Sequence, residues 1–171
     1  MEFSVSEAMR RAGDPIPFSW NGSVAPQTYA GRTIEFCGEA RIQGTLVYDG
    51  KAFTVAAKAE ASYRSECARC GDAFVETVGF PVEERFVRAA VIEEDDSETY
   101  PFSGEFLNLE TAFFDNFYLN MPITGICRED CQGLCPVCGC NLNHTQCGCQ
   151  DLQVDSRLAS LQKLLNDNKE V

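Results

Sequence analysis

The sequence predicts an α+β protein, mainly β, in which a strongly curved antiparallel sheet or small barrel carries a few helices and a C-terminal zinc-binding module. Three observations lead to this class. Apolar and polar residues alternate on both sides of Asp49-Gly50, short segments have helical spacing, and seven cysteines lie between Cys127 and Cys149. At 171 residues, the chain can form one domain with an appended module. We expect a curved-sheet domain with N-terminal and middle helices over residues 1–122. A cysteine-rich zinc module with a C-terminal helix is expected over residues 123–171, packed with the first as one unit.

The first predicted element is a short helix near the N-terminus. Ser4 and Glu7 form a capping-box pattern, and apolar residues follow at helical spacing. Gly13 and Pro15 are expected to end this helix after about two turns.

Two long strands joined by a tight hairpin form the main part of the first domain. Between residues 33 and 48 apolar residues recur with a period of two, as in a half-buried strand. Gly38 and Gly44 fall on the apolar face, where a bulge or a sharp coil of the sheet is expected. Asp49-Gly50 is a strong hairpin signal, and the returning strand over residues 51–64 alternates in the same way. The residues predicted to face inward are Ile34, Phe36, Ala40, Ile42, Leu46 and Tyr48, then Phe53, Val55, Ala57, Ala59, Ala61 and Tyr63.

The later elements follow a tight turn at residues 67–71. A third strand is predicted over residues 73–87. Asn108 can cap a buried helix that runs to about Asn120 and is ended by the proline after it. Beyond the cysteines, Asp155 can cap a last helix with leucines at helical spacing.

The charge of the chain limits its partners. The net charge is −12 at pH 7, and an acidic stretch over residues 93–98 is expected to form a mobile loop. Phosphate backbones repel such a chain, so direct binding to naked RNA is disfavoured and a basic protein is the better partner. The sequence shows no signal-peptide pattern and no apolar run of roughly 18 residues, so we expect a cytoplasmic protein without membrane contact. In a reducing compartment, clustered cysteines bind metal or act in redox chemistry rather than form disulfides.

The segment Cys135-Pro136-Val137-Cys138-Gly139 has the pattern of a metal knuckle. Proline makes the turn rigid, and glycine allows the backbone conformation that points N–H groups at sulfur. Cys147 and Cys149 can complete a tetrahedral thiolate site, for which zinc is the default ion. We expect this site to be structural, with no open position for a small-molecule substrate. His144, the one histidine of the chain, is not expected to be a ligand.

Cys127 and Cys131 leave two arrangements open. Their spacing places both thiols on one face of a helical turn. They can join the site of Cys135 and Cys138 in place of Cys147 or Cys149. Alternatively, they meet Cys67 and Cys70 to form a second four-thiolate site, a hypothesis against which a single zinc ion per chain would count.

The segment Cys67-Ala68-Arg69-Cys70 also permits a redox interpretation. Cys-x-x-Cys is a spacing found in thiol oxidoreductases, and Arg69 can lower a thiol pKa. The redox motif normally opens a helix after a strand, whereas this one is predicted at the end of a β-hairpin. Catalysis by this pair is therefore not expected. Cys37, on the polar face of its strand, has no predicted role.

Several segments together resemble a known family. The run over residues 127–143, Cys-Arg-Glu-Asp-Cys-Gln-Gly-Leu-Cys-Pro-Val-Cys-Gly-Cys-Asn-Leu-Asn, with Cys147-Gly-Cys149 after it, resembles the YceD-like family in its Gram-positive-type variant with a C-terminal cysteine cluster. The central Cys-Ala-Arg-Cys resembles the family's Cys-x-Arg-Cys signature, and residues 106–109, 119–122 and 155–158 are similar to further family segments. Ser156 stands where proline is usual. Cys140 stands where a small residue is usual, which excludes it from the ligands.

The resemblance implies a non-enzymatic ribosome biogenesis factor that supports the accumulation of large-subunit ribosomal RNA. The expected partner is a basic ribosomal protein or an rRNA–protein precursor of the large subunit, held by the sheet and its acidic surface. Some relatives lack the C-terminal cysteines and keep the central pair, which places the shared function nearer Cys67, Cys70 and the sheet. The alternatives are a thiol redox protein acting through Cys67 and Cys70 and a zinc-stapled adaptor protein.

Overall fold

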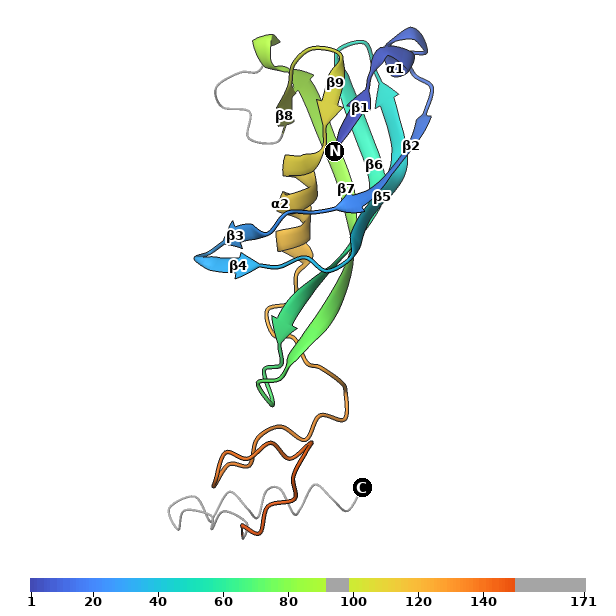
Figure 1. The fold of residues 1–171 in the computed structure, drawn as a ribbon. Helices are drawn as coiled ribbons and strands as arrows, with labels where there is room; N and C mark the ends of the chain where they lie inside the picture. The colour runs from blue at the N-terminus through green and yellow to red at the C-terminus, as the bar shows by residue number, and fades with distance from the viewer. Residues whose placement is uncertain (92–98, 150–171) are drawn as a thin grey trace, which may run out of the picture. The chain divides into compact units, whose positions relative to one another are not determined.

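The computed structural model describes residues 1–91 and 99–149, and β-strands predominate among them (Figure 1). The chain divides into two compact units, one made of Met1–Cys67 and Asp72–Cys127 and the other of Ala68–Gly71 and Arg128–Val171. In the described part of the chain, no helix has the length and apolar character needed to cross a membrane. The predicted acidic loop and C-terminal helix lie outside the described residues. The predicted packing of the two domains stays a prediction.

The first unit is built on a five-stranded sheet in the order β2-β5-β6-β7-β8. The mainly β class is therefore confirmed. β2 and β8 are edge strands, so the small barrel is not confirmed, and the strong curvature stays a prediction. The strands of this sheet are β2 (Ile16–Ser23), β5 (Glu39–Tyr48), β6 (Ala52–Glu66), β7 (Ala73–Arg88) and β8 (Thr99–Phe102).

The predicted antiparallel pairing is confirmed for β5, β6 and β7. The strands β2 and β8 were not predicted, and β8 departs from the antiparallel arrangement. β2 pairs with β5, β5 with β6, and β6 with β7, all in antiparallel orientation. β8, in contrast, runs parallel to β7. A short 3-10 helix, η1 (Ala89–Val91), follows β7. Residues 89–98 separate the two strands, so β8 is not joined to β7 by a tight hairpin and can run parallel to it.

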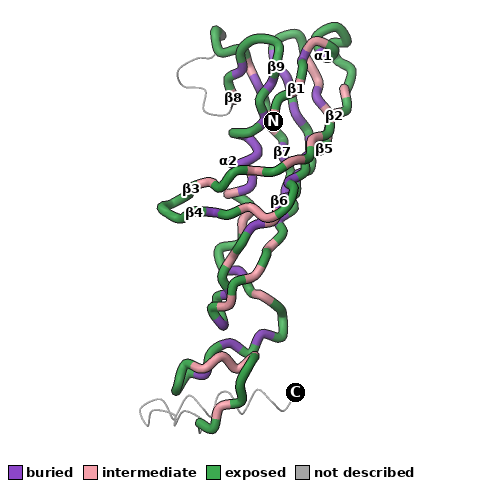
Figure 2. Tube along the Cα trace, in the orientation of Figure 1, coloured by how far each residue is buried: buried purple, intermediate pink, exposed green. Residues whose placement is uncertain are grey.

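β6 shows the predicted alternation most clearly (Figure 2). All six of its predicted inward residues are buried, and Lys58 and Glu60 between them are exposed. The hairpin before it is also confirmed. Gly50 has φ +95°, and the Asp49 side chain accepts hydrogen bonds from the N–H groups of Lys51 and Ala52 at 2.8 and 2.7 Å.

The predicted single strand over residues 33–48 is divided in the structure. β4 (Arg32–Ile34) pairs with β3 (Gln27–Tyr29) in a separate hairpin, and β5 begins at Glu39. Gly38 has φ +75°, a left-handed conformation that interrupts the extended backbone. Phe36, before this break, still forms an isolated β-bridge with Tyr63 of β6. The apolar alternation in the sequence therefore continues across the break. The pattern therefore looks like one strand where there are two.

Gly44 lies where β5 and β6 approach each other closely. An added Cβ would overlap the backbone oxygen of Ala56 and lie 2.5 Å from the Cα of Ala57. The β5–β6 register is continuous here, so this pairing contains no bulge at Gly44.

Gly44→Ala is expected to lower the free energy of unfolding by about 1–3 kcal/mol, because the new methyl group forces the two strands apart. Urea denaturation measures this loss. Gly79→Ala on β7 is the matched control, since its Cβ would meet only the Ala59 oxygen at 4.0 Å. Equal stability of the two variants would contradict the close-approach explanation.

The helix α2 (Glu110–Asn120) packs against β7 and supplies much of the core (Figure 1). Its predicted apolar stripe is confirmed, with Phe113 and Phe117 fully buried. The Asn108 side chain accepts a hydrogen bond from the Glu110 N–H at 2.9 Å, although Leu109 occupies the N-cap position. The backbone of Met121 is extended, so the helix ends before the proline, as predicted.

The predicted N-terminal capping box is wrong. α1 (Ser6–Arg10) has Val5 at its N-cap and no side-chain cap. Ser4 lies one residue too early, in β1 (Glu2–Ser4), which pairs with β9 (Phe106–Asn108). The Glu7 carboxylate forms an ion pair with Arg11 at 3.4 Å instead of reaching back to the helix start.

Candidate metal centres

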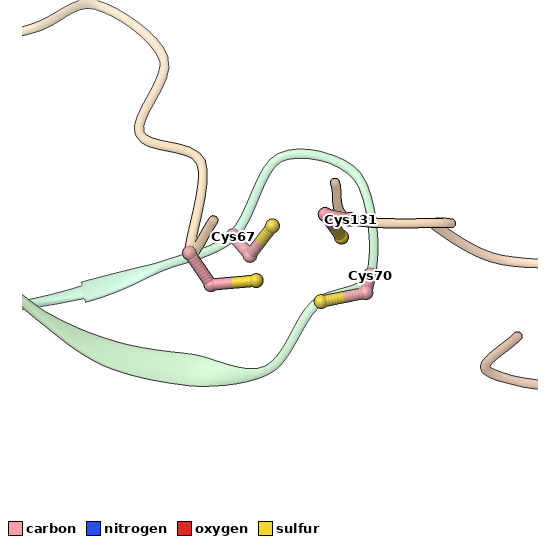
Figure 3. A group of neighbouring side chains, drawn as sticks. Cys67, Cys70 and Cys131 are labelled. Carbon is pink, nitrogen blue, oxygen red and sulfur yellow. The ribbon is translucent and has the colours of Figure 1, made fainter. Parts of the chain in front are cut away.

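The first four-cysteine group consists of Cys67, Cys70, Cys127 and Cys131. Their Sγ atoms all lie within 4.8 Å of one another, so the group could hold a metal ion. The first two come from the turn between β6 and β7, and the other two follow α2. In Figure 3 the side chains of Cys67, Cys70 and Cys131 point toward one another. Cys127 is half-buried and the other three are buried.

The turn that carries Cys67 and Cys70 is fixed by the backbone. The Cys67 N–H donates to the Asp72 carbonyl at 2.9 Å. Gly71 has φ +75°, and an added Cβ there would meet nothing within 4 Å. Glycine is therefore favoured at this position by the left-handed backbone and not by space.

Arg69, between these two cysteines, holds the segment that carries Cys131. Its Nη1 donates to the carbonyl oxygens of Glu129 at 3.2 Å and Cys131 at 3.3 Å. The Arg69 carbonyl in turn accepts a hydrogen bond from the Leu134 N–H at 3.1 Å. The redox interpretation made Arg69 a group that lowers a thiol pKa, whereas these contacts make it a positioning residue for the 129–134 segment.

Arg69→Ala is expected to lower the zinc affinity of the first group about tenfold, because the segment that presents Cys131 loses two hydrogen bonds. Competition with a chromogenic chelator measures the affinity. Arg64→Ala is the control, since Arg64 is exposed and pairs with Glu35 at 3.4 Å. An affinity equal to that of the control would show that Arg69 does not position the ligand.

The second group consists of Cys135, Cys138, Cys147 and Cys149, whose Sγ atoms also lie within 4.8 Å of one another. The Cys147 thiol donates to the Cys135 sulfur at 3.5 Å. Hydrogen bonds from the backbone N–H groups of Cys138 and Val137 lower the pKa of the Cys135 thiol to about 6. This environment favours the thiolate, which is the form that binds metal.

The knuckle over residues 135–139 has the predicted construction. The Val137 N–H points at the Cys135 sulfur at 3.4 Å, and the Gly139 N–H donates to the Cys135 carbonyl at 2.9 Å. Gly139 has φ +73°, close to the value at Gly71, so each Cys-x-x-Cys turn is followed by a left-handed glycine.

The two remaining cysteines and the histidine lie outside both groups. Cys140 is near the second group, and hydrogen bonding to Cys138, followed by burial, raises the pKa of its thiol to about 12. The Cys37 thiol lies 3.8 Å from the Glu35 carbonyl. In the described ranges neither group includes His144 or a carboxylate.

The structure places all eight cysteines that the sequence marked as candidate ligands in two groups of four. Of the two open arrangements, it places Cys127 and Cys131 with Cys67 and Cys70. Sequence reasoning missed Asn143, whose side-chain amide donates to the Cys131 sulfur at 3.4 Å. The available signal for this residue was its place in the Asn-Leu-Asn run that follows the knuckle almost directly.

Both groups suit a soft metal ion. Four cysteines match the tetrahedral all-sulfur set of structural zinc sites, and the same set also suits iron–sulfur chemistry. With four protein ligands, such a site has no open coordination position. The donors present therefore favour a structural role for a bound metal.

Comparison with known proteins places the chain among relatives with a ribosomal description. A family model described as "Large ribosomal RNA subunit accumulation protein YceD" matches residues 55–165. A Zea mays protein named "Large ribosomal RNA subunit accumulation protein YCED homolog 1, chloroplastic" is 31% identical over 64 residues, covering 37% of this chain and 22% of that protein.

Two further relatives are uncharacterized proteins of Mycobacterium tuberculosis and Mycobacterium bovis. Each is 33% identical to the chain over 103 residues, covering 58% of the chain and 49% of the relative. The matched region spans about half the length of these mycobacterial relatives. No solved structure matches the chain.

Proposed function

This chain belongs to the YceD family, described as large ribosomal RNA subunit accumulation proteins, and from that premise we propose that it is a ribosome biogenesis factor supporting large-subunit ribosomal RNA. The family match over residues 55–165 is the observation that carries the proposal. The matched region includes β7, α2 and the eight cysteines of both groups. We propose the cytoplasm as its place of action.

We propose that each four-cysteine group holds one zinc ion as a structural cofactor. Four thiolates satisfy tetrahedral zinc completely, so the ion would fix the surrounding loops and take no part in a reaction. The two Cys-x-x-Cys turns support this role because a left-handed glycine follows each of them, at Gly71 and Gly139.

We propose that the chain acts by binding rather than by catalysis. Cys67 and Cys70 are 3% and 5% exposed, whereas a redox-active cysteine is partly accessible to its substrate. Two further cysteines complete their group, and the Arg69 guanidinium is engaged by backbone carbonyls. These observations favour a structural metal site over thiol–disulfide exchange.

We propose that an acidic surface of the first unit holds a basic ribosomal protein, alone or within an rRNA–protein precursor. Asp115 of α2 accepts a hydrogen bond from the Tyr100 hydroxyl at 2.9 Å, and Glu84 of β7 accepts one from Asn116 at 2.6 Å. Burial raises the pKa of Tyr100, and the adjacent Asp115 and Glu84 raise it further. Across the described residues, neither carboxylate forms a salt bridge, so their negative charge is available to attract a basic partner.

Deletion of the gene is the first test of the ribosomal role. We expect a lower ratio of large-subunit to small-subunit ribosomal RNA and a loss of mature large subunits from sucrose-gradient profiles. Re-expression of the chain restores both. Unchanged ribosomal RNA and unchanged profiles in the deletion strain would contradict the proposal.

Charge reversal tests the acidic surface separately. In a crosslinking pull-down from growing cells, Asp115→Lys is expected to recover less of a basic ribosomal protein than the wild-type chain does. Glu39→Lys makes the same charge change at an exposed position of β5 and is the matched control. Equal recovery by the two variants, or recovery of naked ribosomal RNA first, would contradict the proposed partner.

A further inference from the structure

The two four-cysteine groups are linked by a continuous hydrogen-bonded framework. Cys131 of the first group and Cys135 of the second are separated by residues 132–134. The Leu134 N–H donates to the Arg69 carbonyl at 3.1 Å, on the turn that carries ligands of the first group. Leu134 also forms an isolated β-bridge with Asn141, which lies between ligands of the second group. The short linker is therefore tied to the loops of both groups.

Asn143 makes the most direct link between the groups. Its backbone lies between Cys138 and Cys147, in the loop of the second group. Its side chain, in contrast, contacts the loop of the first group. Nδ2 donates to the Cys131 sulfur at 3.4 Å, and Oδ1 accepts hydrogen bonds from the Gln132 N–H at 2.9 Å and Arg128 Nη2 at 2.8 Å.

The amide of Asn143 is also oriented by its own loop. Its backbone N–H and its Nδ2 both donate to Oδ1 of Asn141, at 3.0 and 2.8 Å. The knuckle closes beside it through a 2.8 Å hydrogen bond from the Cys135 N–H to the Cys140 carbonyl. Ordering of the second group therefore fixes the donor that points at a ligand of the first.

We propose that Asn143 couples the two metal centres, so that metal in either group raises the affinity of the other. An N–H donor stabilises the negative charge on a metal-bound thiolate, and a donor that hydrogen-bonds to a ligand in this way holds the ligand in place. Metal in one group orders the shared loops, so the second ion binds without that ordering cost. Coupling is reciprocal, and we expect an enhancement of about tenfold in each direction.

Zinc competition on the full-length chain tests this coupling. A chromogenic chelator is titrated against the zinc-loaded protein, and cobalt absorption counts the filled thiolate sites. We expect two ions that leave the wild-type chain in one cooperative transition. Binding of a single ion, or release of two ions in independent steps, would overturn the proposal. The coupling rests on the proposed zinc ions, but the experiment needs no ribosomal assay, so its outcome is independent of the proposed ribosomal role.

Variants of Asn143 test whether this residue carries the coupling between the two groups. Asn143→Ala removes all of its side-chain contacts, whereas Asn143→Asp keeps the acceptor and places a carboxylate oxygen against the Cys131 sulfur. Both are expected to bind two ions without cooperativity, so that each group binds zinc about tenfold more weakly when the other group is filled. Asn120→Asp at the end of α2 is the matched control and should behave as wild type. Wild-type affinities and cooperativity in both Asn143 variants would overturn the proposal.

A double-mutant cycle separates coupling from a local effect on the second group. Cys67→Ser with Cys70→Ser removes the first centre, and zinc at the second centre is then expected to bind about tenfold more weakly. In that background Asn143→Ala should cause no further loss. A further tenfold loss would show that Asn143 acts on the second group alone and would overturn the coupling.

Discussion

Replacement of Cys135 and Cys138 by serine is expected to unfold the loops of the second unit. In the described residues from 128 to 149, the only buried positions are Cys131, Gly133 and Cys135, so this segment has almost no apolar core of its own. The proposed zinc ion would supply this order, because metal ligation contributes about 10–16 kcal/mol in small structural zinc domains. The double variant should therefore lose the ordered structure of this segment, and zinc chelation should do the same to the wild-type chain.

Hydrogen exchange resolves this effect residue by residue. The amides of Cys135 and Gly139, which donate to backbone carbonyls, should lose protection in the double variant. The amides of β6 should keep theirs, because strand pairing protects them. Cys37→Ser, outside both groups, is the control. Retained protection at Cys135 and Gly139 without zinc would contradict a metal-ordered segment.

Phe117→Ala is expected to cost about 3–5 kcal/mol of unfolding free energy. Phe117 is fully buried on α2. Its ring lies 5.1 Å from that of Phe36, 5.4 Å from Tyr63 and 5.8 Å from Phe80, so it joins the helix to β6 and β7. Truncation leaves a cavity that these rings cannot close.

Urea denaturation followed by circular dichroism measures the loss in Phe117→Ala. Leu119→Ala, two residues along the same helix, is the matched control because its side chain is 82% exposed. We expect less than about 0.5 kcal/mol for this control. Similar losses in the two variants would mean that α2 contributes helix propensity rather than a packed core.

The long strands and the buried helix could be predicted because their residues carry strong periodic patterns. Every second residue of β6 from Phe53 to Tyr63 is apolar, and each of these side chains is buried. The stripe on α2 is equally regular, with Phe113 and Phe117 four residues apart. In both elements the structure depends on burial of one face, and the spacing of apolar residues in the sequence shows which face is buried.

Elements that depend on a single backbone angle or on a distant partner could not be predicted in the same way. Gly38 breaks the strand over residues 33–48 through a positive φ, while the apolar alternation around it continues. Ser4 has the sequence of a helix cap but pairs with Phe106 in a small sheet. β8 joins β7 in parallel, a pairing that no local pattern specifies. A backbone angle decided the first of these cases, and tertiary pairing decided the other two.

The two four-cysteine groups could be predicted only in part, for a similar reason. The Cys135–Cys138 knuckle and its glycine form a local motif, so its chemistry follows from spacing. Cys127 and Cys131 fit either group by sequence, and only the fold brings them to the β6–β7 turn. The same applies to Arg69, which contacts a carbonyl 60 residues away, and to Asn143, which reaches back 12 residues to Cys131.

Native mass spectrometry of the chain, purified without chelator, tests most directly whether both four-cysteine groups are metal centres. We expect two zinc ions per chain, with the eight grouped thiols protected from alkylation until the metal is removed. Cys37, outside both groups, should react in the metal-bound protein. A single zinc ion per chain, or rapid alkylation of Cys67 and Cys70 in the zinc-loaded protein, would contradict two structural centres.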